Sequence, residues 1–171
     1  MDTLIVYESM YGNTRQIAEA IARGVGGEVA VRSVHEAPEI PEDLRLLVVG
    51  GPTHIHGLST GMSRKAAAEA AAEDGHQPLE PSAVEGDGLR RWLHALPDST
   101  ARAAAFDTRG DKSPYLTGSA ARGIRRRLHH RHYAVDAIES FTVDETEGPL
   151  SDGELDRAEA WGRELAAGSE A

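Results

Sequence analysis

The chain has 171 residues, of which 40% are apolar and 27% charged, a composition typical of a globular protein with room for a substantial core. Its 28 acidic and 18 basic residues give a formal net charge of −10, which argues against nucleic acid as a partner, and the lack of cysteine excludes disulfides, thiolate catalysis and cysteine-bound zinc. With no signal-like N-terminus and no apolar run long enough for a bilayer, we expect a single cytoplasmic domain over residues 1–171 and no membrane partner.

Strand and helix patterns alternate along the chain. Residues 4–7 form a continuous apolar run typical of a strand buried on both faces, and a helical pattern over 17–25 follows and ends in glycines. Further strands are predicted at 28–34, 44–51, 103–108 and 132–143. Further helices are predicted at 63–74, 87–96, 118–128 and 151–165, the last behind a capping-box pattern from Ser151 to Glu154. Five strands alternating with helices predict an α/β protein with a parallel sheet covered on both faces.

The loop after the first strand has the composition of an anion site. Ser9, Asn13 and Thr14 bring hydroxyl and amide groups, Gly12 permits a close backbone approach, and the next helix directs its unpaired N–H groups to the same point. Neither a P-loop nor a dinucleotide-binding glycine motif is present, so the loop favours a phosphate monoester held by hydrogen bonds and the helix dipole. The alternative is that Ser9 or Asn13 only caps the helix.

Three loops together resemble those of flavodoxins, the small FMN-binding electron carriers. They are "ESMYGNT" at 8–14, "GGPTHIHG" at 50–57 and "GDKSPYLTGSA" at 110–120, each after a predicted strand. The resemblance implies a doubly wound sheet of five parallel strands in the order 2-1-3-4-5 and FMN as cofactor, with Tyr115, or His56 from the second loop, against the flavin ring. The cofactor-binding residues that it implies are Ser9, Met10, Tyr11, Gly12, Asn13, Thr14, Pro52, Thr53, His54, Ile55, His56, Gly57, Asp107, Thr108, Arg109, Gly110, Asp111 and Tyr115.

Two functions fit this resemblance. The first is an electron carrier that passes electrons from a reductase to an acceptor protein, and the second is a flavodoxin-like NAD(P)H:quinone oxidoreductase. We favour the carrier and assign no metal ligand. We also assign no catalytic residue, since an acid at a strand end, such as Glu8 or Asp111, is more often a cap or solvated. A receiver domain of the same fold is disfavoured because Gly50 and Gly51 stand where its phosphoacceptor aspartate would be. The basic segment 122–133 is either a solvated helix face or a docking patch for an acidic partner or a cofactor phosphate.

Overall fold

The sheet of the protein has five parallel strands in the predicted order. The structure is a computed structural model that describes residues 1–37, 39–53, 58, 65, 69, 79–80, 88–111, 118–145 and 147–168. The strands lie side by side in the order β2-β1-β3-β4-β5, as in a flavodoxin-like fold, and every pair is parallel. Their bounds are β1 Thr3–Tyr7, β2 Val29–Ser33, β3 Leu46–Pro52, β4 Arg102–Gly110 and β5 Ala134–Val143. The predicted fold class and strand order are therefore confirmed.

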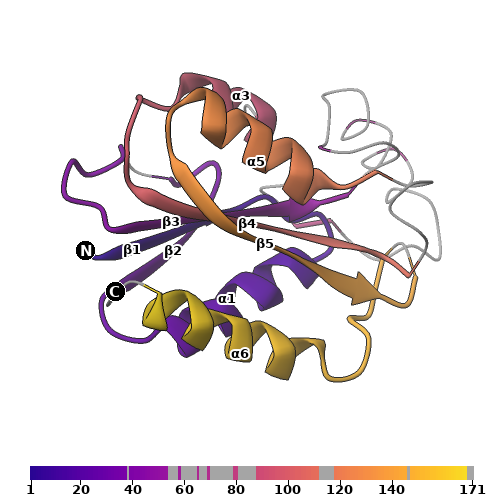
Figure 1. The fold of residues 1–171 in the computed structure, drawn as a ribbon. Coiled ribbons are helices and arrows are strands. Elements are labelled where there is room, and N and C mark those ends of the chain that lie inside the picture. The colour runs from indigo at the N-terminus through magenta and orange to yellow at the C-terminus, as the bar shows by residue number, and fades with distance from the viewer. Residues whose placement is uncertain are drawn as a thin grey trace.

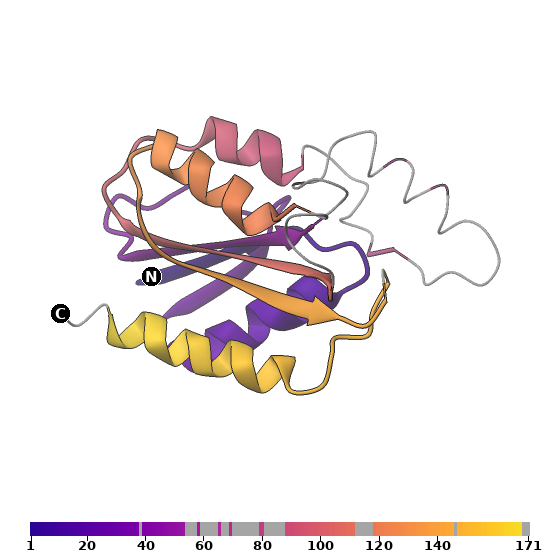
Figure 2. The ribbon, with the colours of Figure 1, turned by 45° about the vertical axis from the view of Figure 1, so that its right-hand side comes forward.

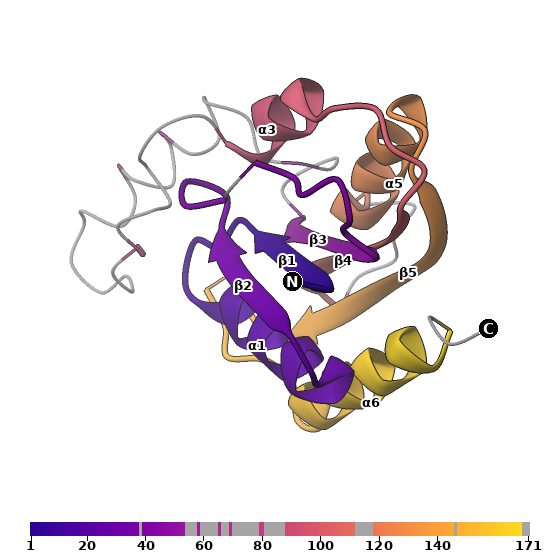
Figure 3. The same ribbon diagram turned by 90° about the vertical axis from the view of Figure 1, so that its left-hand side faces the viewer.

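Helices cover both faces of the sheet. Helices α1 (Asn13–Val25) and α6 (Glu154–Ala167) pack on one face, while α3 (Leu89–Ala95) and α5 (Ala120–His130) lie on the other, as Figures 1 and 2 show. Figure 3 views the sheet from its side and shows β2 at one edge above α1. Within the part of the chain that the structure describes, no helix is long and apolar enough to cross a membrane.

Alternating side chains of the central strands build two separate core layers. Leu4 and Val6 of β1 pack toward α3 and α5, whereas Ile5 packs toward α1 and α6. The second layer contains three aromatic rings in mutual edge-on contact, with centroids 6.1 to 6.5 Å apart: Phe106, Phe141 and Trp161. All five residues of β1 are buried, as the unbroken apolar run predicts for a central strand.

Helices α1 and α6 touch through two glycines. A Cβ atom at Gly24 would lie 2.0 Å from the carbonyl oxygen of Glu159, and one at Gly162 would lie 2.3 Å from that of Ile21. Both glycines therefore let the two helix backbones approach more closely than any side chain would allow. Because α1 begins at the first loop, this contact fixes the helix that follows the predicted phosphate site.

The start of α6 differs from the prediction, and the predicted helix at 63–74 lies mostly outside the described residues. The predicted capping box before α6 is wrong: Gly153 precedes the helix without a side-chain cap, and the Ser151 hydroxyl donates to the Asp144 carboxylate, 2.7 Å away. Of the alanine-rich segment 63–74, only Lys65 and Glu69 lie among the described residues, both in helical conformation.

Glu154 instead links α6 to β5. Its carboxylate accepts the backbone N–H of Thr142 at 2.6 Å and two hydrogen bonds from the Arg157 guanidinium at 2.9 and 2.6 Å. Arg157 also contacts Glu139 at 3.0 Å and stacks 4.5 Å from the centre of the Phe141 ring. Burial alone would raise the pKa of the Glu154 carboxyl, but the hydrogen bonds from Arg157 and Thr142 outweigh it, so the pKa lies below its ordinary value.

This lowered pKa makes the contribution of Glu154 to stability depend on pH. A carboxyl with a depressed folded-state pKa stabilises the fold above its unfolded pKa, and this contribution disappears as pH falls through the folded-state pKa. We expect Glu154→Gln to lower the free energy of unfolding at pH 7 by about 1 to 2 kcal/mol, a value discounted because Arg157 is 42% exposed. In urea denaturation, the difference from the wild type should shrink as the solution is acidified below pH ~4.

Glu159 on the same helix provides the matched control. It pairs with Arg163 at 2.8 Å on the exposed face, so Glu159→Gln should cost less than about 0.5 kcal/mol. Equal losses for both variants, or a Glu154→Gln loss that persists in acid, would contradict the assigned network.

Candidate functional site

The predicted site residues gather at the carboxyl ends of the strands, where β4 sends successive side chains to opposite faces. Phe106 packs in the α1 and α6 layer and Ala105 in the other. Thr108 accordingly reaches α1, while Asp107 reaches the start of α5. One strand end thus contributes to two loops on opposite sides of the sheet.

The first loop is buried and internally ordered. Gly12 adopts φ +88°, a left-handed conformation that favours glycine, and its N–H donates to the Ser9 hydroxyl at 3.1 Å. The Thr14 hydroxyl shares a hydrogen bond of 2.8 Å with that of Thr108. Ser9 and Thr14 are 3% and 1% exposed, and Asn13 is the first residue of α1 and not its cap. The alternative in which Ser9 or Asn13 merely caps α1 is therefore wrong.

The start of α1 differs electrostatically from the other helix starts. The first N–H of α3 is bound by the Glu8 carboxylate at 2.7 Å, as the cap interpretation of Glu8 predicts. Helix α5 is capped by Ser119, and α6 carries two acidic residues in its first turn. Of these four described helices, α1 and α3 lack both a side-chain cap from the N-cap residue and an acidic residue in the first turn, and α3 has the Glu8 carboxylate instead. Among the residues that the structure describes, no carboxylate binds the first N–H groups of α1, so these groups and the partial positive charge of the helix start can bind an anion.

A salt bridge lies beside this helix start. The Nε of Arg15 contacts the Glu80 carboxylate at 2.7 Å, and the Glu80 N–H donates to the Met10 carbonyl at 2.8 Å. A Cβ atom at Gly12 would lie 3.5 Å from the same carboxylate. No sequence motif joins residue 80 to this loop, because the connecting segment carries no recognisable spacing signal. The Glu80 carboxylate thus brings a negative charge close to the start of α1, whose own first turn has no acidic residue.

Asp107 joins the second and third loops. Its Oδ2 accepts hydrogen bonds from the Ser119 hydroxyl at 2.7 Å, from the Thr53 hydroxyl at 2.9 Å and from the Ala121 N–H at 2.9 Å. The Thr53 hydroxyl in turn accepts the Ala120 N–H at 2.9 Å. Asp107 is 0% exposed, and its Oδ1 has no hydrogen-bond partner within the described ranges. Asp107 and Thr53 are thus positioning residues that hold the loops together.

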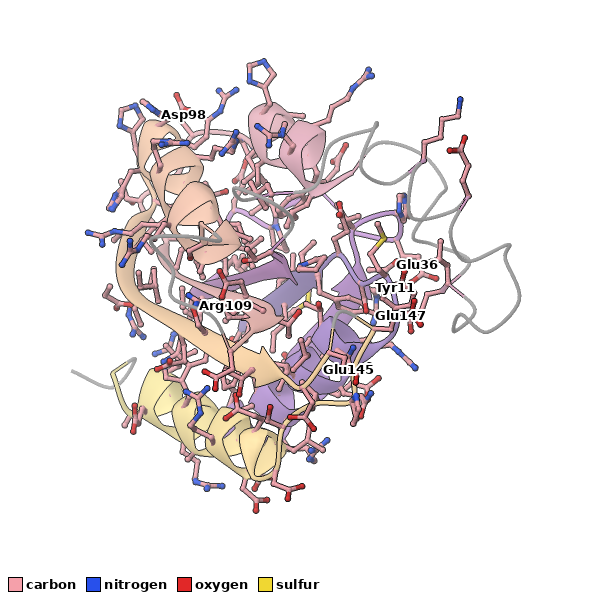
Figure 4. The ribbon with its side chains drawn as sticks, turned by 90° about the vertical axis from the view of Figure 1, so that its right-hand side faces the viewer. Tyr11, Glu36, Asp98, Arg109, Glu145 and Glu147 are labelled. Atoms are coloured by element: carbon pink, nitrogen blue, oxygen red, sulfur yellow. The ribbon has the colours of Figure 1, made fainter. Side chains whose placement is uncertain are left out.

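The segment after β5 also reaches the first loop, which the sequence did not predict. The Asn13 amide donates to the Glu147 carbonyl at 3.0 Å, and a Cβ atom at Gly148 would lie 2.7 Å from the Asn13 side chain. Burial, and secondarily the Glu147 charge, raise the pKa of Tyr11. Figure 4 shows Tyr11 beside Glu147 on this edge. Asn13 and Glu147 are 134 positions apart in the sequence, which explains why no local signal could reveal the contact.

Arg109 lies apart from the first loop. Figure 4 shows it near β5, across the strand ends from Tyr11. It lines an open pocket of about 150 Å³ together with Ser119, Ala121, Arg122, Ile138, Glu139 and Ser140. The structure therefore divides the predicted third-loop residues between the first loop, which Thr108 meets, and this second hollow.

Part of the predicted site lies outside the described residues. His54, Ile55, His56, Gly57 and Tyr115 belong to this part, so the assignment of a ring contact to Tyr115 or His56 stays a prediction. Pro52 ends β3, and Gly110 and Asp111 are exposed at the end of β4.

Several solved structures share this architecture. An archaeal flavodoxin matches with a TM-score of 0.61 and 16% identity over 100% of both chains. Oxidised flavodoxin 1 from Bacillus cereus matches with a TM-score of 0.59 and 18% identity, over 96% of this chain and 97% of that one. A WrbA-like flavodoxin from Agrobacterium tumefaciens gives 0.56 and 19%, over 98% and 96%. At these identities the likeness concerns the fold.

Family membership follows from the sequence comparison. No curated protein sequence matches this chain. The family model described as flavodoxin matches residues 5–119, which include the first loop, Asp107 and Ser119, the residue that caps α5. This match covers more than half of the chain, and the chain belongs to the flavodoxin family.

Proposed function

We propose that the protein binds FMN at the carboxyl ends of β1, β3 and β4 and carries electrons between a reductase and an acceptor protein, in the cytoplasm. The observation that carries the proposal is the start of α1, which has neither a cap nor an acidic residue in its first turn and adjoins the buried hydroxyls of Ser9 and Thr14. Flavodoxin-family membership supports FMN as the anion. Bound FMN would supply the redox chemistry, and the protein would supply binding, orientation and control of the potential.

The donor set of the first loop fits a phosphate monoester. The loop offers hydroxyl and backbone N–H donors, and Arg15 is engaged by Glu80 at 2.7 Å and by Glu19 at 3.8 Å. Helix N–H groups and hydroxyls can hold a dianion without a dedicated lysine. In this assignment Ser9, Gly12 and Thr14 hold the phosphate, while Asp107 orders the two loops on the other side of β4.

The phosphate assignment predicts specific losses of affinity. Thr14→Val removes a hydroxyl donor and Gly12→Val strains a backbone with φ +88°, so each should weaken FMN binding by at least about 1 kcal/mol in a fluorescence titration. Riboflavin, which lacks the phosphate, should bind much more weakly than FMN to the wild type. The loss of affinity that Thr14→Val or Gly12→Val causes should be much smaller for riboflavin than for FMN.

Two controls separate phosphate binding from structural support. Thr108→Val breaks the Thr14–Thr108 hydrogen bond but keeps the Thr14 hydroxyl, so it should weaken FMN binding less than Thr14→Val does. Thr3→Val changes a buried threonine at the opposite end of β1 and should leave affinity unchanged. Equal losses for Thr14→Val and Thr108→Val would mean that Thr14 only supports the loop.

The Glu80 carboxylate should oppose FMN binding. Glu80→Gln removes a negative charge beside Gly12 and releases Arg15, so we expect FMN affinity to rise by roughly threefold to tenfold at low salt, less at high salt. Glu19→Gln removes the same charge from the same arginine one turn further along α1, and its effect should be smaller. Weaker binding in Glu80→Gln would instead assign Glu80 a supporting role in the loop.

The carrier and oxidoreductase functions differ in their response to nicotinamide. A carrier's holoprotein should be reduced slowly by NADH or NADPH alone and quickly once a flavoprotein reductase is added, as followed by loss of flavin absorbance. Rapid bleaching by NADPH alone, with turnover on benzoquinone, would instead favour the quinone oxidoreductase. The flavin released on heating should be FMN and not FAD.

A further inference from the structure

The surface of α3 and α5 is strongly basic in an acidic protein. We call it the α3–α5 basic face; its members are Arg90, Arg91, His94, Arg122, Arg125, Arg126, Arg127, His129, His130, Arg131 and His132. Across residues 88–100 and 118–132 the only acidic residue is Asp98, so seven arginines and one aspartate give +6 without the histidines. Since the whole chain carries −10, the remainder carries −16. Figure 4 shows nitrogen-tipped side chains around these helices, in the region of Asp98.

Helices α1 and α6 each pair an arginine with a glutamate of the same helix, whereas the sequence of α5 contains no acidic residue. Arg15 on α1 and Arg163 on α6 each face a glutamate four residues away. On α5, Arg122 has Arg126 at the same spacing, an unfavourable like-charge pair. Arg125 donates to the His129 imidazole and Arg127 to the Gly123 carbonyl, neither of which removes positive charge.

The fold concentrates this charge further by joining two helices. Arg90 from α3 lies close enough to α5 that it helps to lower the pKa of Arg127, after burial and together with Arg126. Arg131 pairs with Asp98 at 3.5 Å, which removes a single positive charge. The helix dipole accounts for cations in the last turn of α5 but disfavours Arg122 in its first turn. Stability therefore does not explain the arrangement.

We propose that the α3–α5 basic face docks onto an acidic surface of a partner protein. All seven cations are arginines, whose planar guanidinium groups bind carboxylates through paired hydrogen bonds. A long nucleic acid would extend beyond the face and meet the −16 remainder. A membrane-surface helix would need exposed apolar residues, whereas Ile124 and Leu128 are buried. A compact acidic protein surface can stay within the face and needs no exposed apolar residues on α5. The proposal does not depend on bound FMN.

The test measures binding of a fluorescein-labelled oligo-glutamate peptide to the full-length protein by fluorescence anisotropy. Arg125→Glu/Arg126→Glu reverses two exposed arginines of the face. Arg32→Glu/Arg163→Glu reverses two exposed arginines on β2 and α6 and gives the same net charge. We expect the wild type to bind with an affinity that falls with salt, the first variant to bind at least about tenfold more weakly, and the control about twofold or less.

Three results would overturn the proposal. Equal losses in the two double variants would assign the effect to net charge, and no binding by the wild type at low salt would leave α5 a solvated helix. Tighter binding of a duplex DNA oligonucleotide or of phosphatidylserine vesicles than of the peptide, at equal salt, would assign the face to nucleic acid or lipid. Arg125→Gln/Arg126→Gln, which removes charge without reversing it, should give an intermediate loss and guards against misfolding of the reversed variant.

Discussion

The buried carboxylate of Asp107 organises the edge of the sheet that carries the site. A charged side chain with no solvent exposure is costly unless polar groups surround it, and here three donors converge on one oxygen. They come from the loop after β3, from the residue that caps α5 and from the first turn of α5. Removing the carboxylate would therefore release both the loop after β3 and the start of α5. The direction of Thr108 toward α1 follows from the same strand, since neighbouring side chains alternate.

The distribution of acidic groups around the helix starts explains how an acidic protein could hold the proposed anion site. Glu8 and Asp107 bind N–H groups at the starts of α3 and α5, and α6 supplies its own acids. Each of these carboxylates compensates the partial positive charge of the helix start beside it. The start of α1 lacks such a group, and the nearby Glu80 is neutralised by Arg15. Selectivity for the proposed anion site would thus arise from where the acidic residues are placed and not from an excess of cations.

Much of the fold could be predicted because its signals are local. The apolar run at Leu4–Tyr7 and the glycine, hydroxyl and amide residues after it placed β1, the first loop and α1 correctly. The capping box at Ser151 failed because a side chain from α6 can reach β5, and Glu154 binds Thr142 across the fold. The contacts of Glu80 with Arg15 and of Glu147 with Asn13 were missed for the same reason, since they join segments distant in sequence.

Helix α5 connects the proposed docking surface to the proposed cofactor site. Its first turn is held by Asp107 at the strand ends, and its outer side carries the basic face. Eleven residues of α helix span about 16 Å, so a partner on this face lies within that distance of the loop after β4. The net charge of −16 on the rest of the chain would disfavour docking of an acidic partner elsewhere. The charge asymmetry would therefore act mainly on the orientation of the encounter, placing the partner beside α5, while short-range contacts determine how long it stays bound.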